Sequence, residues 1–136
     1  FDPMLYLEVD PREEEASRPP FRLGAYGYWD DHPLASQRWG STAHYLAARA
    51  EALRVQAPVG ALWYIAAPLL IQSLDDGFNW IAELHSQGAQ VAAWTLDADH
   101  PEQVALARRL TALGVDRITT NDPPALARVL DGDIVY

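Results

Sequence analysis

The chain has 136 residues, enough for one hydrophobic core, and predicts a single domain over 1–136. A hydrophobic share of 49% excludes a disordered chain, and a formal charge of −9 argues against general nucleic-acid binding. With no cysteine and no lysine, disulfides, thiolate metal sites and lysine Schiff bases are excluded. No apolar run is long enough to cross a bilayer, so we expect a soluble protein, with a cytoplasmic location favoured.

The N-terminal part of the chain predicts two strands separated by a loop. Residues 4–9 form an apolar run that carries one acid, Glu8, and this pattern is typical of a strand. Residues 11–20 are charged and rich in proline, which predicts a surface loop. Residues 21–28 predict a second strand, and 29–40 form an aromatic and polar loop.

Two helices flank a strand in the middle of the chain. A serine or threonine at 41–42 can cap a helix through about Arg54. Residues 61–67 are strongly apolar, which predicts a strand buried on both faces. Ser73 has an acid three residues later, and this capping box predicts a helix through His85.

The last third of the chain alternates strands with helices. Residues 91–96 are a short apolar run suited to a buried strand. Pro101 stands where a helix would begin, and Gly114 supplies a left-handed stop after its apolar face. Residues 115–120 predict the next strand, and the turn at 121–123 opens a final helix. This order predicts an α/β fold with parallel strands covered by helices.

A longer pattern joins these elements over about 88–130. A glycine is followed by a strand that ends in Trp94 and Thr95, then by a helix, then by Leu-Gly-Val-Asp-x-Ile-x-Thr-x-Asp-Pro over 113–123. This pattern resembles the end of the glycerophosphodiester phosphodiesterase family, where it forms the last two β/α units of a (β/α)8 barrel. The resemblance implies a partial TIM-barrel-like fold that holds about the last four β/α units.

The length of the chain agrees with a partial barrel. A complete barrel typically needs about 250 residues, roughly twice this chain. We therefore expect a fragment, a processed piece or a chain that has lost its first half. A half-barrel leaves sheet edges unpaired, so we expect a missing N-terminal half, a homo-oligomer or a rearranged sheet.

The resemblance implies one metal ligand and one substrate contact. The family carries a Glu-x-Lys motif whose glutamate binds a divalent cation, and Glu8 matches it while Asp10 stands in place of the lysine. Glu8 is therefore the expected ligand of Mg²⁺ or Ca²⁺, and an exposed glutamate on an edge strand is the alternative. Trp94 is expected to line the substrate pocket, and a tryptophan that fills the core is the alternative. Further polar side chains expected at the same rim are Thr95, Asn121 and Asp122, of which Asp122 also suits a helix cap.

No catalytic residue can be assigned in this chain. The family uses a His-Arg pair, a Glu-x-Asp metal motif and a second histidine, and none of these stands in its expected place here. Acids and histidines gather only at 30–32 and 97–100, and both places precede a proline and indicate turn or N-cap chemistry. His85 is interpreted as a packed imidazole on a helix face.

Two functions remain open. The resemblance implies part of a metal-dependent phosphodiesterase of lipid metabolism, which hydrolyses glycerophosphodiesters to an alcohol and glycerol 3-phosphate. The alternative is a non-catalytic binding or interaction protein derived from the same barrel. The aromatic loop over 26–39 is its candidate surface.

Overall fold

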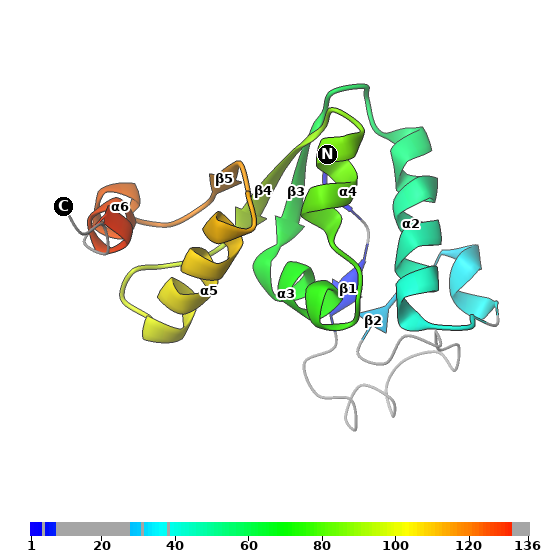
Figure 1. Cartoon of the computed structure of the whole chain (residues 1–136), viewed down its shortest axis with the longest axis horizontal. Helices are drawn as coiled ribbons and strands as arrows, with labels where there is room; N and C mark the ends of the chain where they lie inside the picture. Colours follow the sequence, from blue (N-terminus) through cyan, green and yellow to red (C-terminus); the bar gives the residue numbers. More distant parts are fainter. Residues whose placement is uncertain (4, 8–27, 31, 38, 132–136) are drawn as a thin grey trace.

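The computed structural model describes residues 1–3, 5–7, 28–30, 32–37 and 39–131, which form a mixed arrangement of helices and strands (Figure 1). None of the helices in this part of the chain is both long and apolar enough to span a bilayer. The elements in chain order are β1 (Tyr6–Leu7), β2 (Tyr28–Trp29), the 3-10 helix η1 (Pro33–Ser36), α2 (Thr42–Gln56), β3 (Leu62–Ala66), α3 (Ala67–Asp75), α4 (Trp80–Ser86), β4 (Gln90–Trp94), α5 (Pro101–Ala112), β5 (Arg117–Ile118) and α6 (Pro123–Asp131).

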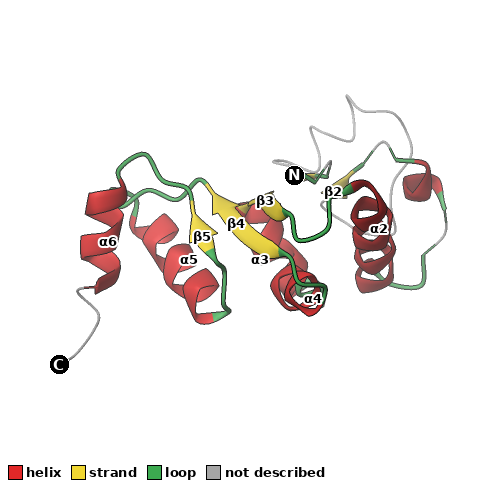
Figure 2. Cartoon of the chain, turned by 90° about the horizontal axis from the view of Figure 1, so that it is seen from above, coloured by secondary structure: helices red, strands yellow, loops and turns green. Residues whose placement is uncertain are grey.

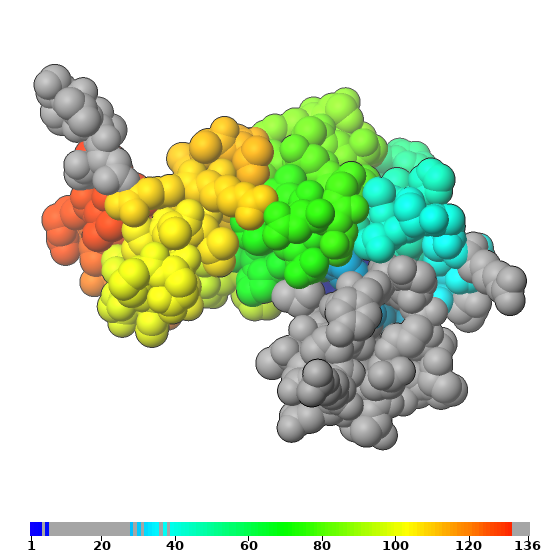
Figure 3. All heavy atoms as spheres, turned by 60° about the horizontal axis from the view of Figure 1, so that its bottom comes forward, coloured from blue at the N-terminus to red at the C-terminus, as the bar shows by residue number. Residues whose placement is uncertain are grey.

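The centre of the molecule is a parallel sheet with the strand order β3-β4-β5. In its register, Leu62 lies opposite Gln90, and Ala92 lies opposite Arg117. Figure 2 shows that α3, α4 and α5 all lie on one side of this sheet. The space-filling view in Figure 3 shows α3 between α2 and α5 on that side of the molecule. The predicted β/α alternation with parallel strands is therefore confirmed for this part of the chain.

The hydrophobic core lies between the sheet and these helices. Trp63 and Ile65 of β3 and Val91 and Ala93 of β4 point toward the helices and are at most 1% exposed. The helices contribute further buried side chains to the same cluster: Leu69, Leu70, Trp80, Ile81, Leu84, Ala107 and Leu110. Apolar residues at helical spacing thus bury one face of each helix against the sheet.

The other side chains of the strands form a second surface, which we call the open face. It consists of Leu62, Tyr64 and Ala66 of β3, Gln90, Ala92 and Trp94 of β4, and Arg117 of β5, as alternation along the strands and the register require. Tyr64 is 41% exposed, so the prediction that 61–67 is buried on both faces is wrong. Parallel strands are normally covered on both sides, whereas the helices in the described part of the chain cover one side only.

The first residues of the chain take two different pairings. The Phe1 amino group donates to the Leu62 carbonyl at 2.9 Å, and the Tyr64 amide donates to the Phe1 carbonyl at 2.7 Å. This is the bonding pattern of a parallel pair, and it extends the sheet beyond β3. A few residues later, β1 pairs antiparallel with β2 in a separate two-stranded sheet. The predicted strand over 4–9 is present at Tyr6–Leu7, and it pairs with β2 in this separate two-stranded sheet.

Helix starts follow the predicted chemistry in one case and depart from it in another. The Ser41 side chain accepts from the His44 amide at 3.2 Å and caps α2, which confirms the predicted cap. The capping box at Ser73 is wrong, because Ser73 lies inside α3. The next helix, α4, starts after Asn79, whose side chain accepts from the Ala82 amide at 3.0 Å.

Ser73 has a different role. Its hydroxyl is fully buried and accepts from Trp80 Nε1 at 3.0 Å and from the Tyr28 hydroxyl at 3.3 Å. A serine with an acid three residues later occurs both at a helix start and within a helix, so the spacing alone did not distinguish them. The stop predicted at Gly114 is confirmed, since its φ is 95°.

Candidate functional site at the carboxyl edge of the sheet

Trp94 is the last residue of β4 and lies on the open face. Its side chain is 40% exposed, so it does not fill the core. In α/β proteins with parallel strands, ligands bind at the carboxyl ends of the strands. Trp94 therefore lies at the carboxyl edge of the sheet, exposed on its open face.

Asp97 joins the loops that follow β4 and β5. One carboxylate oxygen accepts from the Asn121 amide at 2.8 Å and from the Thr120 hydroxyl at 3.0 Å, and the other accepts from Asn121 Nδ2 at 2.8 Å. The Asn121 amide is the main cause that holds the pKa of Asp97 below its ordinary value, with help from the Thr120 hydroxyl. Asp97 thus connects the loops after β4 and β5 through these hydrogen bonds, which we call the Asp97 latch. This role goes beyond the predicted turn.

Asp122 caps α6 as predicted, because its carboxylate accepts from the Ala125 amide at 3.1 Å. Beside it lies an open hollow of about 260 Å³. The hollow is lined by Asp97, Ala98, Asp99, Asn121, Asp122 and Ala125. Two of its three carboxylates already accept hydrogen bonds from the protein.

The described residues do not supply a metal site. Within them, no group of three or more His, Asp or Glu side chains could hold a metal ion. Glu8, the predicted ligand, and Asp10 lie outside the described residues. His100 lies at the N-cap position of α5, as predicted for 97–100, but its side chain does not cap the helix and is 3.7 Å from Asp99.

Asp30 has a structural role, which the sequence analysis did not assign to it. It is fully buried and binds Arg49 Nε, and it accepts a short hydrogen bond from the Tyr45 hydroxyl. Burial, followed by the neighbouring carboxylate, raises the pKa of Tyr45. A sign of this pairing was present in the sequence, because Arg49 interrupts the apolar face of a helix that also carries Tyr45 four residues earlier. Asp31 lies outside the described residues.

His85 lies at the opposite edge of the sheet, where the strands begin. Its Nε2 is 2.7 Å from Asp116 Oδ2, which also accepts from the Val91 amide at 2.8 Å. The imidazole is 38% exposed, so the interpretation as a packed side chain is wrong. Polar contacts at the amino ends of parallel strands generally serve stability.

Comparison with known proteins gives limited information. No protein-family model and no curated protein matches the chain. Among solved structures, the chain is similar to the "putative glycerophosphoryl diester phosphodiesterase" of Silicibacter pomeroyi DSS-3. The identity is 28%, the match covers 60% of this chain and 23% of that protein, and the TM-score is 0.44. The match spans less than a quarter of that protein, and a TM-score this low does not establish a shared fold.

Proposed function

We propose that this chain forms the closing β/α units of a phosphodiesterase barrel that hydrolyses glycerophosphodiesters to an alcohol and glycerol 3-phosphate. The observation that carries the proposal is the position of Trp94. It ends β4 at the carboxyl edge, exposed on the face that no described helix covers. In a closed barrel the corresponding face lines the interior, and the carboxyl edge forms the active site.

Each residue has a limited role in this proposal. The Trp94 indole provides an apolar wall for the carbon atoms of the substrate and excludes water from one side of it. The Asp97 latch holds the loops after β4 and β5 together, so that the wall keeps its position. Glu8 is proposed as a ligand of Mg²⁺ or Ca²⁺. A divalent cation of this kind would polarise the phosphodiester.

The second candidate is a non-catalytic binding protein, and the chemistry of the carboxyl edge favours it. The edge carboxylates Asp97 and Asp122 are both engaged in hydrogen bonds within the protein. A general base needs to reach the proton that it removes, and these two groups are committed elsewhere. We therefore expect this chain alone to bind the phosphomonoester product, glycerol 3-phosphate, without turning over a substrate.

Titration of the chain with glycerol 3-phosphate tests the proposal. This compound is the product common to all glycerophosphodiesters, and calorimetry would follow its binding with Mg²⁺, with Ca²⁺ and with EDTA. We expect binding that needs the cation, is lost in Glu8→Ala, and is weakened about tenfold in Trp94→Ala, which corresponds to 1.4 kcal/mol.

Val59→Ala is the matched control, because Val59 is fully exposed in the loop that precedes β3 and should not alter binding. Release of choline from glycerophosphocholine would be measured in parallel. The absence of glycerol 3-phosphate binding with either cation would contradict the proposal and leave the interaction protein as the better function.

A further inference from the structure

Two aromatic side chains on the open face differ from the others that the structure describes. Tyr64 and Trp94 are 41% and 40% exposed, and neither makes a ring contact or a side-chain hydrogen bond with a described residue. The other aromatic side chains described each have a ring or hydrogen-bond partner: Phe1, Tyr28, Trp39, Tyr45, Trp63, Phe78 and Trp80. Tyr64 and Trp94 are therefore available to a ligand.

These two side chains are neighbours across the sheet. Tyr64 lies opposite Ala92 in the register, and Trp94 follows two residues later on the same face of β4. Diagonal neighbours of this kind have Cα atoms about 7–8 Å apart. Ala92, which lies opposite Tyr64 and two residues before Trp94, is 1% exposed and does not belong to the core cluster on the helix side. The Ala92 methyl group is thus covered, while the two rings beside it on the same face remain exposed.

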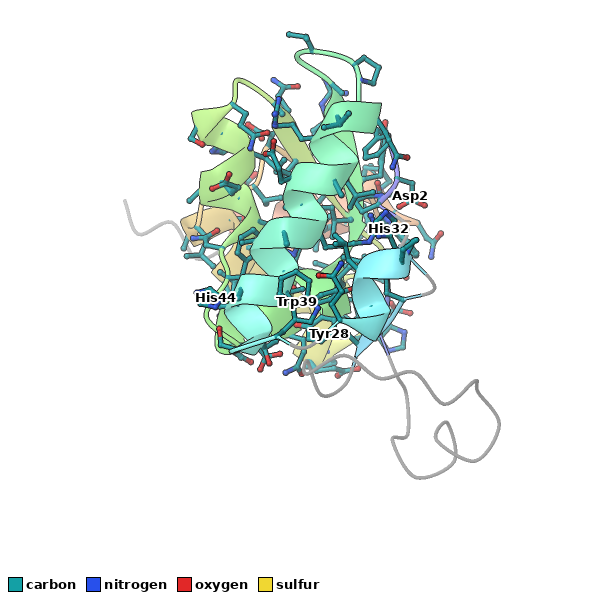
Figure 4. All side chains as sticks on the ribbon, turned by 90° about the vertical axis from the view of Figure 1, so that its right-hand side faces the viewer. Asp2, Tyr28, His32, Trp39 and His44 are labelled. Carbon is teal, nitrogen blue, oxygen red and sulfur yellow. The ribbon has the colours of Figure 1, made fainter. Side chains whose placement is uncertain are left out.

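Opposite charges flank the two rings. The Phe1 ring contacts Trp63 on the helix side, with centroids 4.7 Å apart, so the next residue, Asp2, points toward the open face. Figure 4 shows Asp2 on the opposite side of the molecule from His44. On the other flank, Arg117 lies opposite Ala92. Asp2 and Arg117 are exposed, and neither forms an ion pair with a described residue.

We propose that the open face binds the zwitterionic headgroup of a glycerophosphocholine. The trimethylammonium group lies between the rings of Tyr64 and Trp94, and the phosphate lies against Arg117. This inference rests on the proposed function and specifies the alcohol that the substrate carries.

The two charged groups of the headgroup match the side chains on the open face. A quaternary ammonium has no hydrogen to donate, so aromatic faces bind it through the attraction between a cation and a π system. Asp2 adds a negative potential on the same flank. The Arg117 guanidinium suits a phosphate, because its fork of N–H groups matches two phosphate oxygens. A neutral glycerol headgroup would use Arg117 and the apolar face of Trp94, but it carries no cation for the Tyr64 ring to bind.

Competition between headgroups tests the inference. Calorimetry would compare glycerophosphocholine, glycerophosphoglycerol and free choline on the full chain. We expect glycerophosphocholine to bind about tenfold more tightly than glycerophosphoglycerol, in line with a partly desolvated cation–π contact. Tyr64→Leu should remove this preference and leave glycerophosphoglycerol binding unchanged.

Two variants sharpen the test. Tyr64→Phe keeps the aromatic face and removes only the hydroxyl, so the preference for choline should survive. Arg117→Gln should weaken both phosphodiesters by a similar factor and leave free choline unaffected, because choline carries no phosphate.

Each other outcome has a definite meaning. Equal affinity for the two diesters would overturn the headgroup assignment while the proposed function stands. Choline binding without binding of any glycerophosphodiester would support the aromatic site and overturn the proposed function. A dimer in analytical ultracentrifugation that Tyr64→Leu dissociates would overturn the inference, because a second copy would then cover the open face.

Discussion

Two regions of this molecule use the same kinds of side chain in opposite ways. Around α2, Asp30, Tyr45 and Arg49 are buried and hold one another by hydrogen bonds and an ion pair. On the open face, Tyr64 and Arg117 are exposed and have no such partner among the described residues. An acid, an arginine and an aromatic ring thus form a closed cluster in one region and a free surface in the other.

The difference follows from the cost of leaving polar groups without partners. In the interior, a polar group without a hydrogen bond costs about 1–3 kcal/mol and a charge costs more, so the α2 cluster has to satisfy its members within the protein. On the open face, water satisfies the same groups, and a ligand can replace that water at little cost. We infer that the α2 cluster stabilises the fold and that the open face is available for binding.

The largest effect is expected from Asp30→Asn, which removes the charge that Arg49 faces in the interior. Breaking a buried ion pair from one side typically costs about 3–5 kcal/mol. Since a whole domain has only about 5–15 kcal/mol of stability, this variant should lose a large part of its free energy of unfolding. Urea unfolding followed by circular dichroism would measure the loss.

Glu51→Gln is the matched control, because Glu51 pairs with Arg54 on the exposed surface of the same helix. This change should not shift the unfolding midpoint measurably. Equal effects of the two variants would show that the buried pair contributes no more than a surface pair, and the contrast between the two regions would then be lost.

Local patterns allowed the C-terminal elements to be predicted from the sequence. The strand that ends at Trp94, the helix after Pro101 and the stop at Gly114 all depend on residues close together in the chain. Ser73 was assigned to a capping box because its spacing to an acid is also local. Its actual partners, Tyr28 and Trp80, come together only in the folded chain.

In the candidate site, too, only the features that depend on local sequence could be predicted. The position of Trp94 followed from the end of its strand, whereas the Asp97 latch depends on contact between two loops that are separated by a whole helix. The pairing of Asp30 with Arg49 connects a short loop with the middle of α2, and the helical spacing of Tyr45 and Arg49 marks only the helix side of it. The exposure of the open face was likewise not predictable, since Tyr64 stands in an apolar run typical of a buried strand.

A smaller effect, dependent on pH, is expected at the amino ends of the strands. Burial alone would raise the pKa of Asp116, but the hydrogen bonds from His85 and from the Val91 amide outweigh it and hold the pKa below its ordinary value of 3.8. The unfolded chain therefore binds protons more readily in acid. The contribution of this carboxylate to stability is complete above that ordinary value and is lost as the pH falls through the lower, folded value.

Asp116→Asn tests whether this carboxylate stabilises the fold near neutral pH and loses that contribution in acid. Both side chains of the pair are substantially exposed, so the substitution should lower the free energy of unfolding by less than about 1 kcal/mol near neutral pH. The difference from the unmodified chain should shrink as the pH falls below the ordinary value of the carboxyl group. Urea unfolding at several pH values would measure it, and a difference that does not change with pH would contradict the assigned pairing.

The smallest effect on stability is expected on the open face itself. Tyr64→Leu and Trp94→Ala remove exposed rings that have no described partner, and surface changes of this kind usually alter the free energy of unfolding by no more than about 0.5 kcal/mol. The rings serve recognition if both variants are as stable as the unmodified chain, while Tyr64→Leu loses the preference for glycerophosphocholine and Trp94→Ala binds glycerol 3-phosphate about tenfold more weakly. A loss of several kcal/mol would instead mean that the rings are buried in solution, so that the open face would belong with the α2 cluster as a part of the molecule that maintains the fold.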